Sequence, residues 1–190
     1  TVLTTYDDTV QKMNEEKKKE YWQEAKAYNE RLAGTTPQLT DAFSDKGNKE
    51  DSDYNQILNL EEDTGVMGSI EIPKISVYLP IYHGTDGSTL EKGVGHLLGS
   101  SFPVGGKGTH TVLTGHSGLS REKMLTDLEK MKVGDRFFLH VLDRTLAYEV
   151  RDIFTVLPDD TSHLGIQQDE DMCTLITCTP YGVNTHRLLV

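Results

Sequence analysis

The feature that most constrains the fold is a series of short runs of strand-forming residues that begins near Met67. Proline and glycine punctuate these runs, and turn residues separate them. Several short strands at such close spacing predict a β-barrel or a β-sandwich. The runs read GSIEIPKISVYLPIYHG, HTVLTGH, DRFFLHVL, LAYEVRDIFTVL, MCTLITC and THRLLV.

Two local features are expected within this β region. The DRFFLHVL and LAYEVRDIFTVL runs should pair as a hairpin across a short Asp143-Arg144 turn. One helix should interrupt the strands at residues 120–131, with Ser120 as its N-cap and Gly134 ending the turn that follows.

The N-terminal region has a different pattern. Residues 5–32 are expected to form one helix, because apolar side chains recur every three or four positions among Glu and Lys. Gly34 is a suitable stop, with Pro37 just beyond it. Residues 37–56 are polar and acidic, and long segments of this kind are lids, binding loops or disordered. Phe43 either needs a surface to dock on or is incidental in a disordered loop.

The charge of the chain excludes some classes of function. The formal net charge is −11, which argues against a nucleic-acid surface because neutralising phosphates needs clustered Lys and Arg. An acidic surface is compatible with cationic partners, lysine amines included. The sequence has no zinc-type Cys/His spacing, no glycine-rich phosphate loop and no dinucleotide fingerprint, so no metal or cofactor is expected.

The sequence contains no run of 18 or more apolar residues, so we expect no transmembrane helix within it. Both ends look trimmed, and the chain is therefore compatible with a longer parent protein that carries membrane anchors.

The chain has two cysteines, Cys173 and Cys178. In one continuous strand they face opposite sides and lie about 16 Å apart, whereas a disulfide needs Cα atoms within about 7 Å. We therefore expect both thiols to be free. Free thiols fit a reducing compartment, and they equally fit a surface enzyme with a working thiol.

Cys178 sits at the exit of a strand, directly before a Pro180-Tyr181-Gly182 turn. Free cysteine is most often a small buried hydrophobe, and a nucleophile additionally needs a histidine and a group that stabilises an oxyanion. His116 lies in a glycine-flanked loop after a strand, which can present its ring to a cleft. Arg187 lies in an apolar terminal strand, where its charge must be paired or functional. Strand alternation puts His186 on the opposite face from Arg187.

The residues alone leave other interpretations open. His116 is equally well explained as a loop histidine without a partner, and Arg187 as half of a structural ion pair. Of the remaining histidines, His140 is expected to be structural and His163 solvated. Packing or loop-bonding roles are expected for two others, His83 and His96.

Longer motifs carry a specific resemblance. LTGHSGL, TLITCTPYGVNTHRLLV, MGSIEIPKISVYLPIYHGT and GVGHLLGSSFPVGGKGTHT resemble the sortases, and among them the class C, pilus-building sortases. The resemblance extends from about Met67 to Val190. It implies a mainly β fold, an eight-stranded sortase-type β-barrel with short helices, preceded by an N-terminal helical segment and a lid loop. The expected organisation is a helical region at 1–36, a lid or linker at 37–60 and the catalytic barrel at 61–190.

The resemblance also implies roles for individual residues. Cys178 would be the nucleophile, His116 the general acid and base, and Arg187 the cation that positions substrate or stabilises the oxyanion.

The family lid is built on Asp, Pro and an aromatic residue, and the matching positions here are Asp41, Ala42 and Phe43. Asp41 would reach toward the site arginine, and Phe43 would lie over the nucleophile. Ala42 departs from the usual proline. Because proline restricts the unfolded chain by about 0.4–1 kcal/mol, alanine should leave the lid looser.

The implied activity is transpeptidation of LPxTG-like sorting signals through a thioester, with transfer to a pilin lysine amine. The partners would be pilin subunits, and the location would be the outer face of the membrane or the cell wall of a Gram-positive bacterium. One alternative is a housekeeping-type sortase that anchors proteins to cell-wall peptide. Another is a non-enzymatic acidic β-domain, adhesive or calcium-binding, with the carboxylates of residues 157–171; that loop lacks the carboxylate spacing of a calcium loop.

Overall fold

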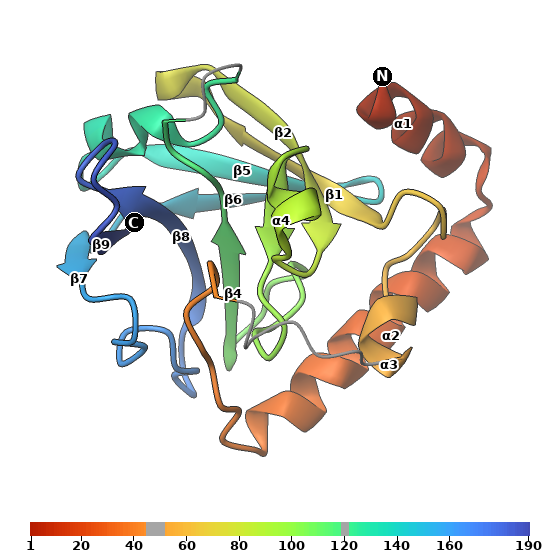
Figure 1. Cartoon of the computed structure of the whole chain (residues 1–190). Helices are drawn as coiled ribbons and strands as arrows, with labels where there is room; N and C mark the ends of the chain where they lie inside the picture. Colours follow the sequence, from red (N-terminus) through yellow and green to blue (C-terminus); the bar gives the residue numbers. More distant parts are fainter. Residues whose placement is uncertain (45–51, 119–121) are drawn as a thin grey trace.

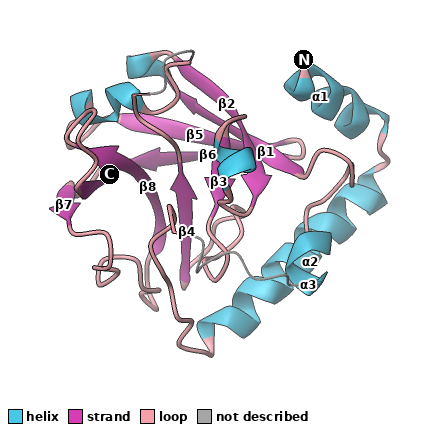
Figure 2. Ribbon diagram, viewed as in Figure 1, coloured by secondary structure: helices cyan, strands magenta, loops and turns pink. Residues whose placement is uncertain are grey.

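The structure, a computed structural model, describes residues 1–44, 52–118 and 122–190. Within these ranges the strands form one sheet in the order β6-β5-β1-β2-β3-β4-β8-β9-β7. Figure 2 shows this sheet curling round on itself, with the helices at its periphery. The expected mainly β fold is confirmed. The described strands number nine where the family resemblance implied eight, and two of them, β3 and β7, have only three residues each.

The strands have the following bounds: β1 Val66–Ile72, β2 Val77–His83, β3 Val94–His96, β4 Thr109–Thr114, β5 Arg136–Val141, β6 Arg144–Glu149, β7 Phe154–Val156, β8 Asp171–Thr179 and β9 His186–Leu189. The helices are α1 Val2–Lys12, α2 Glu15–Ala33, α3 Ser52–Gln56 and α4 Gly87–Leu90, with 3-10 turns η2 Pro73–Ile75 and η3 Thr126–Lys130.

Two of the strand pairs, β2–β3 and β4–β8, are parallel, and the others are antiparallel. The predicted hairpin forms between β5 and β6, and Leu142 takes a positive φ of 55° at its turn. Arg144 already belongs to β6, so the turn lies one residue earlier than expected. The second run of this hairpin is divided, since β7 leaves it to pair with β9 at the edge of the sheet.

The expectation of one N-terminal helix over residues 5–32 is wrong. Two helices form, because Asn14 adopts an extended conformation and its side chain accepts a hydrogen bond from the Lys17 N–H at 2.8 Å. This is an N-cap, which starts a new helix rather than continuing the old one. The second helix ends at Ala33 with Gly34 as its C-cap, as predicted. None of the helices in the described part of the chain is long and apolar enough to cross a membrane.

The helix expected at residues 120–131 is also wrong, and its proposed cap Ser120 lies outside the described residues. In the described part of this segment, residues 122–131, only the short 3-10 turn η3 forms. Met124 has a φ of 42°, and the Leu125 N–H donates to the His116 carbonyl at 3.0 Å, so the chain cannot form regular helix before η3.

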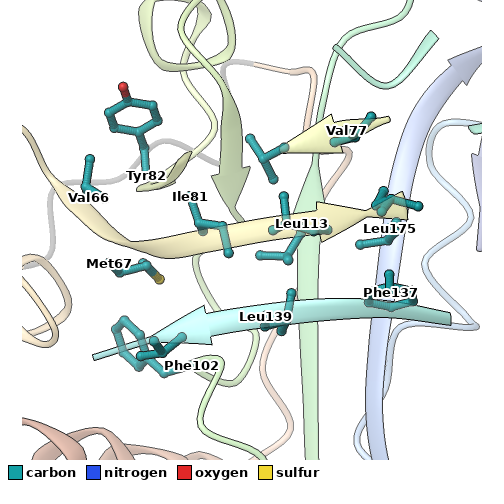
Figure 3. Packing of buried hydrophobic residues seen from close by; sticks show 14 of the residues in the cluster. Val66, Met67, Val77, Ile81, Tyr82, Phe102, Leu113, Phe137, Leu139 and Leu175 are labelled. Carbon is teal, nitrogen blue, oxygen red and sulfur yellow. The ribbon is translucent and has the colours of Figure 1, made fainter. Parts of the chain in front are cut away.

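The main hydrophobic core is formed by side chains of the curled sheet together with residues of the N-terminal helices. Figure 3 shows Ile81, Leu113, Leu139 and Leu175 converging from four different strands. Helices α1 and α2 add buried side chains to the same cluster, among them Tyr6, Val10, Trp22 and Ala25. Residues 1–36 therefore pack as part of the molecule, while the division into three regions stays a prediction.

A buried amide fixes α2 to the sheet region. The Asn29 side chain donates to the Phe102 carbonyl at 3.1 Å and accepts from the Phe102 N–H at 2.8 Å, and both residues are buried. The Phe102 carbonyl has a second donor in the Thr111 hydroxyl, so the loss of Asn29 would leave the Phe102 N–H without its partner. The amide thus holds the helix that immediately precedes residues 37–44.

Asn29→Ala is expected to lower the free energy of unfolding by about 1–3 kcal/mol, because it leaves the Phe102 N–H buried without its partner. Urea denaturation followed by circular dichroism measures this change. The control is Asn55→Ala on the exposed side of α3, for which a change within about 0.5 kcal/mol is expected. Equal stability of the two variants would contradict the assignment.

Candidate active site

Cys178 and Arg187 lie opposite each other on neighbouring strands. In the antiparallel β8–β9 pair, Cys178 is the register partner of Arg187, and Thr179 is the partner of His186. Directly opposed residues project from the same face of a sheet, about 4.5–5.5 Å apart at Cβ. The turn after Pro180 thus brings Cys178 and Arg187 opposite each other.

His116 follows β4, the strand that pairs with β8 on the side opposite to β9. The parallel β4–β8 register ends with Thr114 beside Ile176, and the Gly115 N–H still donates to the Ile176 carbonyl at 3.0 Å. Two residues farther on, the Ser117 hydroxyl donates to the Cys178 carbonyl at 2.8 Å, so the loop that carries His116 stays next to Cys178. The chain turns away at Gly115, where a Cβ would lie 2.7 Å from the Leu125 side chain, so only glycine fits.

The segment after α2 lies against these residues. In Figure 1 it is the orange segment that rises beside β4. Asp41 binds Arg187 with both carboxylate oxygens, accepting from Nε at 3.0 Å and from Nη2 at 3.0 Å. The pair is largely buried, with side-chain exposures of 12% for Arg187 and 17% for Asp41. Such a two-pronged, charge-assisted contact is among the stronger hydrogen-bonded interactions in proteins.

Phe43 contacts two of the three candidate residues. Its ring centroid is 5.7 Å from that of His116, and the Arg187 guanidinium carbon lies 5.0 Å from it. The second contact is a cation–π interaction. The docking surface that an aromatic residue in a polar loop requires is therefore this pair of side chains.

Ala42 sits between Asp41 and Phe43 and is the most deeply buried of the three, with 3% of its surface exposed. It belongs to a second apolar cluster, on the opposite face of the sheet from the main core. The other members of this second cluster are Leu97, Val112, Leu164, Ile176 and Leu189. The burial of Ala42 was not predicted, because the sequence indicated only that alanine makes the segment more flexible than proline would.

The Cys178 thiol is held in its protonated form in this arrangement. Burial raises its pKa, the Arg187 guanidinium lowers it, and the Asp41 carboxylate raises it, with a net upward result. Because Asp41 neutralises the cation beside the thiol, the docked segment weakens the one interaction that would favour the thiolate.

The pKa of His116 is shifted in the opposite direction. Burial lowers the pKa of its imidazole, and the Glu91 carboxylate raises it by a smaller amount. The net downward shift favours the neutral ring at neutral pH. Both shifts favour the uncharged forms of the thiol and the imidazole.

The raised pKa of Cys178 predicts how its alkylation rate depends on pH. In a Cys173→Ala background, the alkylation rate of Cys178 by iodoacetamide should rise with pH through a midpoint above that of an ordinary cysteine. Asp41→Asn should move the midpoint downward, because it removes a negative charge that disfavours the thiolate and leaves the Arg187 charge unneutralised. Asp143→Asn, at a carboxylate that pairs with Lys18, is the control and should leave the midpoint in place. An upward shift in the Asp41 variant would contradict this electrostatic account.

The other histidines have structural partners. His83 contacts the Gly65 and Ile57 carbonyls at 2.7 and 2.6 Å, and the buried His96 contacts Tyr54 and Ser101. These are the packing and loop-bonding roles that were expected for the two.

Two further expectations concern His140 and His163. His140 bonds Thr145 and Glu71 at 2.9 and 3.1 Å, in agreement with a structural role. His163 is exposed as predicted, and it also stacks on Phe154 at 3.8 Å.

Cys173 differs from Cys178 in its surroundings. It packs against the main core, and burial strongly raises the pKa of its thiol. Both cysteines are free, as their spacing predicted. Cys173 therefore packs on the core face of β8, whereas Cys178 shares the other side of the site with Arg187, and only Cys178 is placed to react.

Sequence reasoning missed Ser117. Its hydroxyl donates to the Cys178 carbonyl at 2.8 Å and joins the histidine loop to the cysteine strand. Its position directly after His116 was the only signal available, because the parallel pairing of β4 with β8 cannot be predicted from the sequence of either segment. Within the described ranges, no group of three His, Cys, Asp or Glu side chains could hold a metal ion.

A curled β-sheet that presents a cysteine and an arginine on adjacent strands, with a histidine loop beside them, has the architecture of a cysteine transpeptidase. A profile of the sortase domain matches residues 70–190, well over half of the chain. The chain therefore belongs to the sortase family, and the non-enzymatic alternative is wrong.

Known sortases are similar to most of this chain. Sortase D of Bacillus subtilis is 33% identical over 152 residues, which is 80% of this chain and 72% of that protein. Sortase C1 of Streptococcus agalactiae is 44% identical with a TM-score of 0.91, covering 100% of this chain and 95% of that one. Sortase C of Streptococcus pneumoniae is 42% identical with a TM-score of 0.88, covering 100% and 93%. The top structural neighbours are class C sortases, and the family acts on LPxTG-type substrates.

Proposed function

We propose that this sortase polymerises pilin subunits, with Cys178 as nucleophile, His116 as general acid and base, and Arg187 as the cation at the reacting carbonyl. The observation that carries the assignment is the register. The β8–β9 pairing has Arg187 opposite Cys178, and the Ser117–Cys178 hydrogen bond and the contact of Phe43 with both His116 and Arg187 support His116 as the third member of the site. These groups are the nucleophile, proton carrier and oxyanion partner that acyl transfer requires.

The first half of the reaction starts from the uncharged pair. His116 takes the proton of the Cys178 thiol, and the thiolate attacks the threonine carbonyl carbon of the sorting signal. The Thr–Gly C–N bond then breaks, His116 gives its proton to the departing glycine amine, and a thioester remains on Cys178. Arg187 offers its N–H groups to the carbonyl oxygen while it carries negative charge.

The second half reverses the proton path. A pilin lysine amine attacks the thioester carbonyl and loses a proton to His116, and the C–S bond breaks. The product is an isopeptide bond, and the sulfur recovers its proton from His116. Histidine suits both steps because its pKa lies near neutral pH.

Residues 37–44 serve as a lid in this proposal. Asp41 occupies the guanidinium that substrate would use, Ala42 fills the apolar cluster beneath it, and Phe43 contacts the His116 ring. A sorting signal and this segment cannot use the same groups at once, so the lid must move before substrate binds. The lid thereby keeps the enzyme inactive at rest.

The proposed partners are pilin subunits that carry LPxTG-like sorting signals and acceptor lysines. The class C neighbours support this, and the S. pneumoniae enzyme is described in terms of pilin substrate specificity. Sortases of Gram-positive bacteria act at the cell surface. We place this protein at the outer face of the membrane or in the cell wall, with membrane anchor segments in the parent protein.

Competition between acceptors tests this function. The Asp41→Ala variant is incubated with an LPxTG-type peptide, together with a lysine-bearing pilin peptide and an oligoglycine peptide of the housekeeping type. Mass spectrometry of the products identifies the acceptor. A product joined through the lysine side chain supports pilin polymerisation, whereas exclusive use of the oligoglycine amine would mean a housekeeping-type sortase.

A further inference from the structure

The parallel ladder between β4 and β8 does not stop where the two strands end. Its last backbone bond runs from the Gly115 N–H to the Ile176 carbonyl at 3.0 Å. In a parallel pair, successive bonds to one edge of a strand fall two residues apart. The next bond in the series would therefore join the Ser117 N–H to the Cys178 carbonyl.

A side chain takes this place. The Ser117 Oγ donates to the Cys178 carbonyl at 2.8 Å, across a contact that is partly buried. The backbone of the loop is free to turn away, and the hydroxyl still completes the bond that a backbone N–H would have made. His116 lies between the last backbone bond and this side-chain bond.

Two other hydrogen bonds hold the rest of the loop. The His116 carbonyl accepts from the Leu125 N–H, and the Gly118 N–H donates to the Thr126 hydroxyl, each at 3.0 Å. Both of these bonds lead to the start of η3, at its N-cap Leu125 and its first residue Thr126, and neither reaches β8. Only the Ser117 bond among those described beyond Gly115 fixes it to the strand that carries the nucleophile.

We propose that Ser117 is a positioning residue for acyl transfer, and that its hydroxyl keeps the His116 ring level with the Cys178 sulfur by extending the β4–β8 ladder. The proposal rests on the roles proposed above for Cys178 and His116. Proton transfer between the two requires hydrogen-bond reach, and misplacement by about 1 Å can cost as much as 100-fold in rate.

Ser117→Ala and Ser117→Thr test the proposal, made in the Asp41→Ala background so that the lid does not limit the rate. Turnover of an LPxTG-type peptide should fall about tenfold in kcat for the alanine variant, with KM within twofold, because the bond places catalytic groups and does not bind substrate. Threonine keeps a hydroxyl and should restore kcat to within about threefold. Thr109→Val is the control: it removes a hydroxyl that donates to the Gly106 carbonyl at 2.7 Å, at the other end of β4, and should leave kcat unchanged.

A second measurement does not depend on turnover. Hydrogen exchange of the Gly115 amide, followed by NMR, reports on the last backbone bond of the ladder. It should become at least about fivefold faster in Ser117→Ala and return toward the parent rate in Ser117→Thr.

The outcomes separate this proposal from the proposed function. Unchanged kcat in Ser117→Ala, an equal loss in Ser117→Thr, or unchanged Gly115 exchange would each overturn the positioning role. If the Cys178→Ala variant turned over peptide like its parent, or the parent turned over none, the proposed function would fail. The Gly115 exchange rates would still show whether the hydroxyl holds the ladder together.

Discussion

Cys178→Ala should abolish formation of the acyl-enzyme, whereas Cys173→Ala should retain activity within about twofold of the parent. Without Cys178 no sulfur remains at the level of His116 and Arg187, and alanine offers no other nucleophile. Cys173 packs on the core face, with a thiol whose pKa is raised by burial. Its loss should cost about 1 kcal/mol of stability through packing alone.

Peptide cleavage measured by liquid chromatography distinguishes the two variants, and circular dichroism establishes that both are folded. They form a matched pair, since each removes one sulfur from the same strand. A folded Cys173→Ala protein without activity, or an active Cys178→Ala protein, would contradict the assignment of the nucleophile.

Releasing the lid should produce the second large effect. Asp41→Ala removes two hydrogen bonds to a charged group, and such bonds contribute about 1.5–3 kcal/mol each to a docked state. The two bonds share one carboxylate and need not add, so we take the loss of one as the minimum effect. If substrate binds only when the lid is open, this loss raises the open fraction, and hence turnover at low substrate, at least roughly ten- to hundredfold. Phe43→Ala should act in the same direction by removing the contacts with His116 and Arg187.

Asp53→Ala is the control for the lid, since it removes an exposed aspartate farther along the same connecting segment. Initial rates at low peptide concentration should match the parent. If the Asp41 and Phe43 variants also matched the parent while folded, residues 37–44 would not restrain the enzyme.

Point variants test the lid better than removal of the N-terminal region does. Tyr6 of α1 lies in the main core, where its hydroxyl donates to the Met67 carbonyl at 3.2 Å and accepts from the Leu142 N–H at 3.0 Å. Burial raises the pKa of this phenol to about 12. Deleting residues 1–49 would open the core as well as the site.

Local patterns in the sequence predicted the parts of this structure that depend on neighbouring residues. Alternation and turn chemistry predicted the runs that form most of the strands, although not β3, and the hairpin of β5 with β6. This hairpin joins segments that follow one another along the chain. The approach of Asp41 to Arg187 was expected only from the family resemblance, and the structure has that contact.

Features that depend on tertiary context could not be predicted in this way. The parallel pairing of β4 with β8 joins segments about 60 residues apart, and the role of Ser117 follows from that register. The expected helix at 120–131 failed because the Leu125 N–H bonds to His116 in place of a helical partner. The break at Asn14 could have been found, since asparagine followed by two glutamates is a typical helix start.

The measurement that tests the central claim most directly is the intact mass of the protein after incubation with an LPxTG-type peptide. It compares the unmodified chain, Asp41→Ala and Asp41→Ala with Cys178→Ala. We expect an adduct of the acyl fragment that is weak in the first, strong in the second and absent in the third. An adduct that persists without Cys178, or none in folded Asp41→Ala protein, would contradict a lid-restrained acyl transfer through this cysteine.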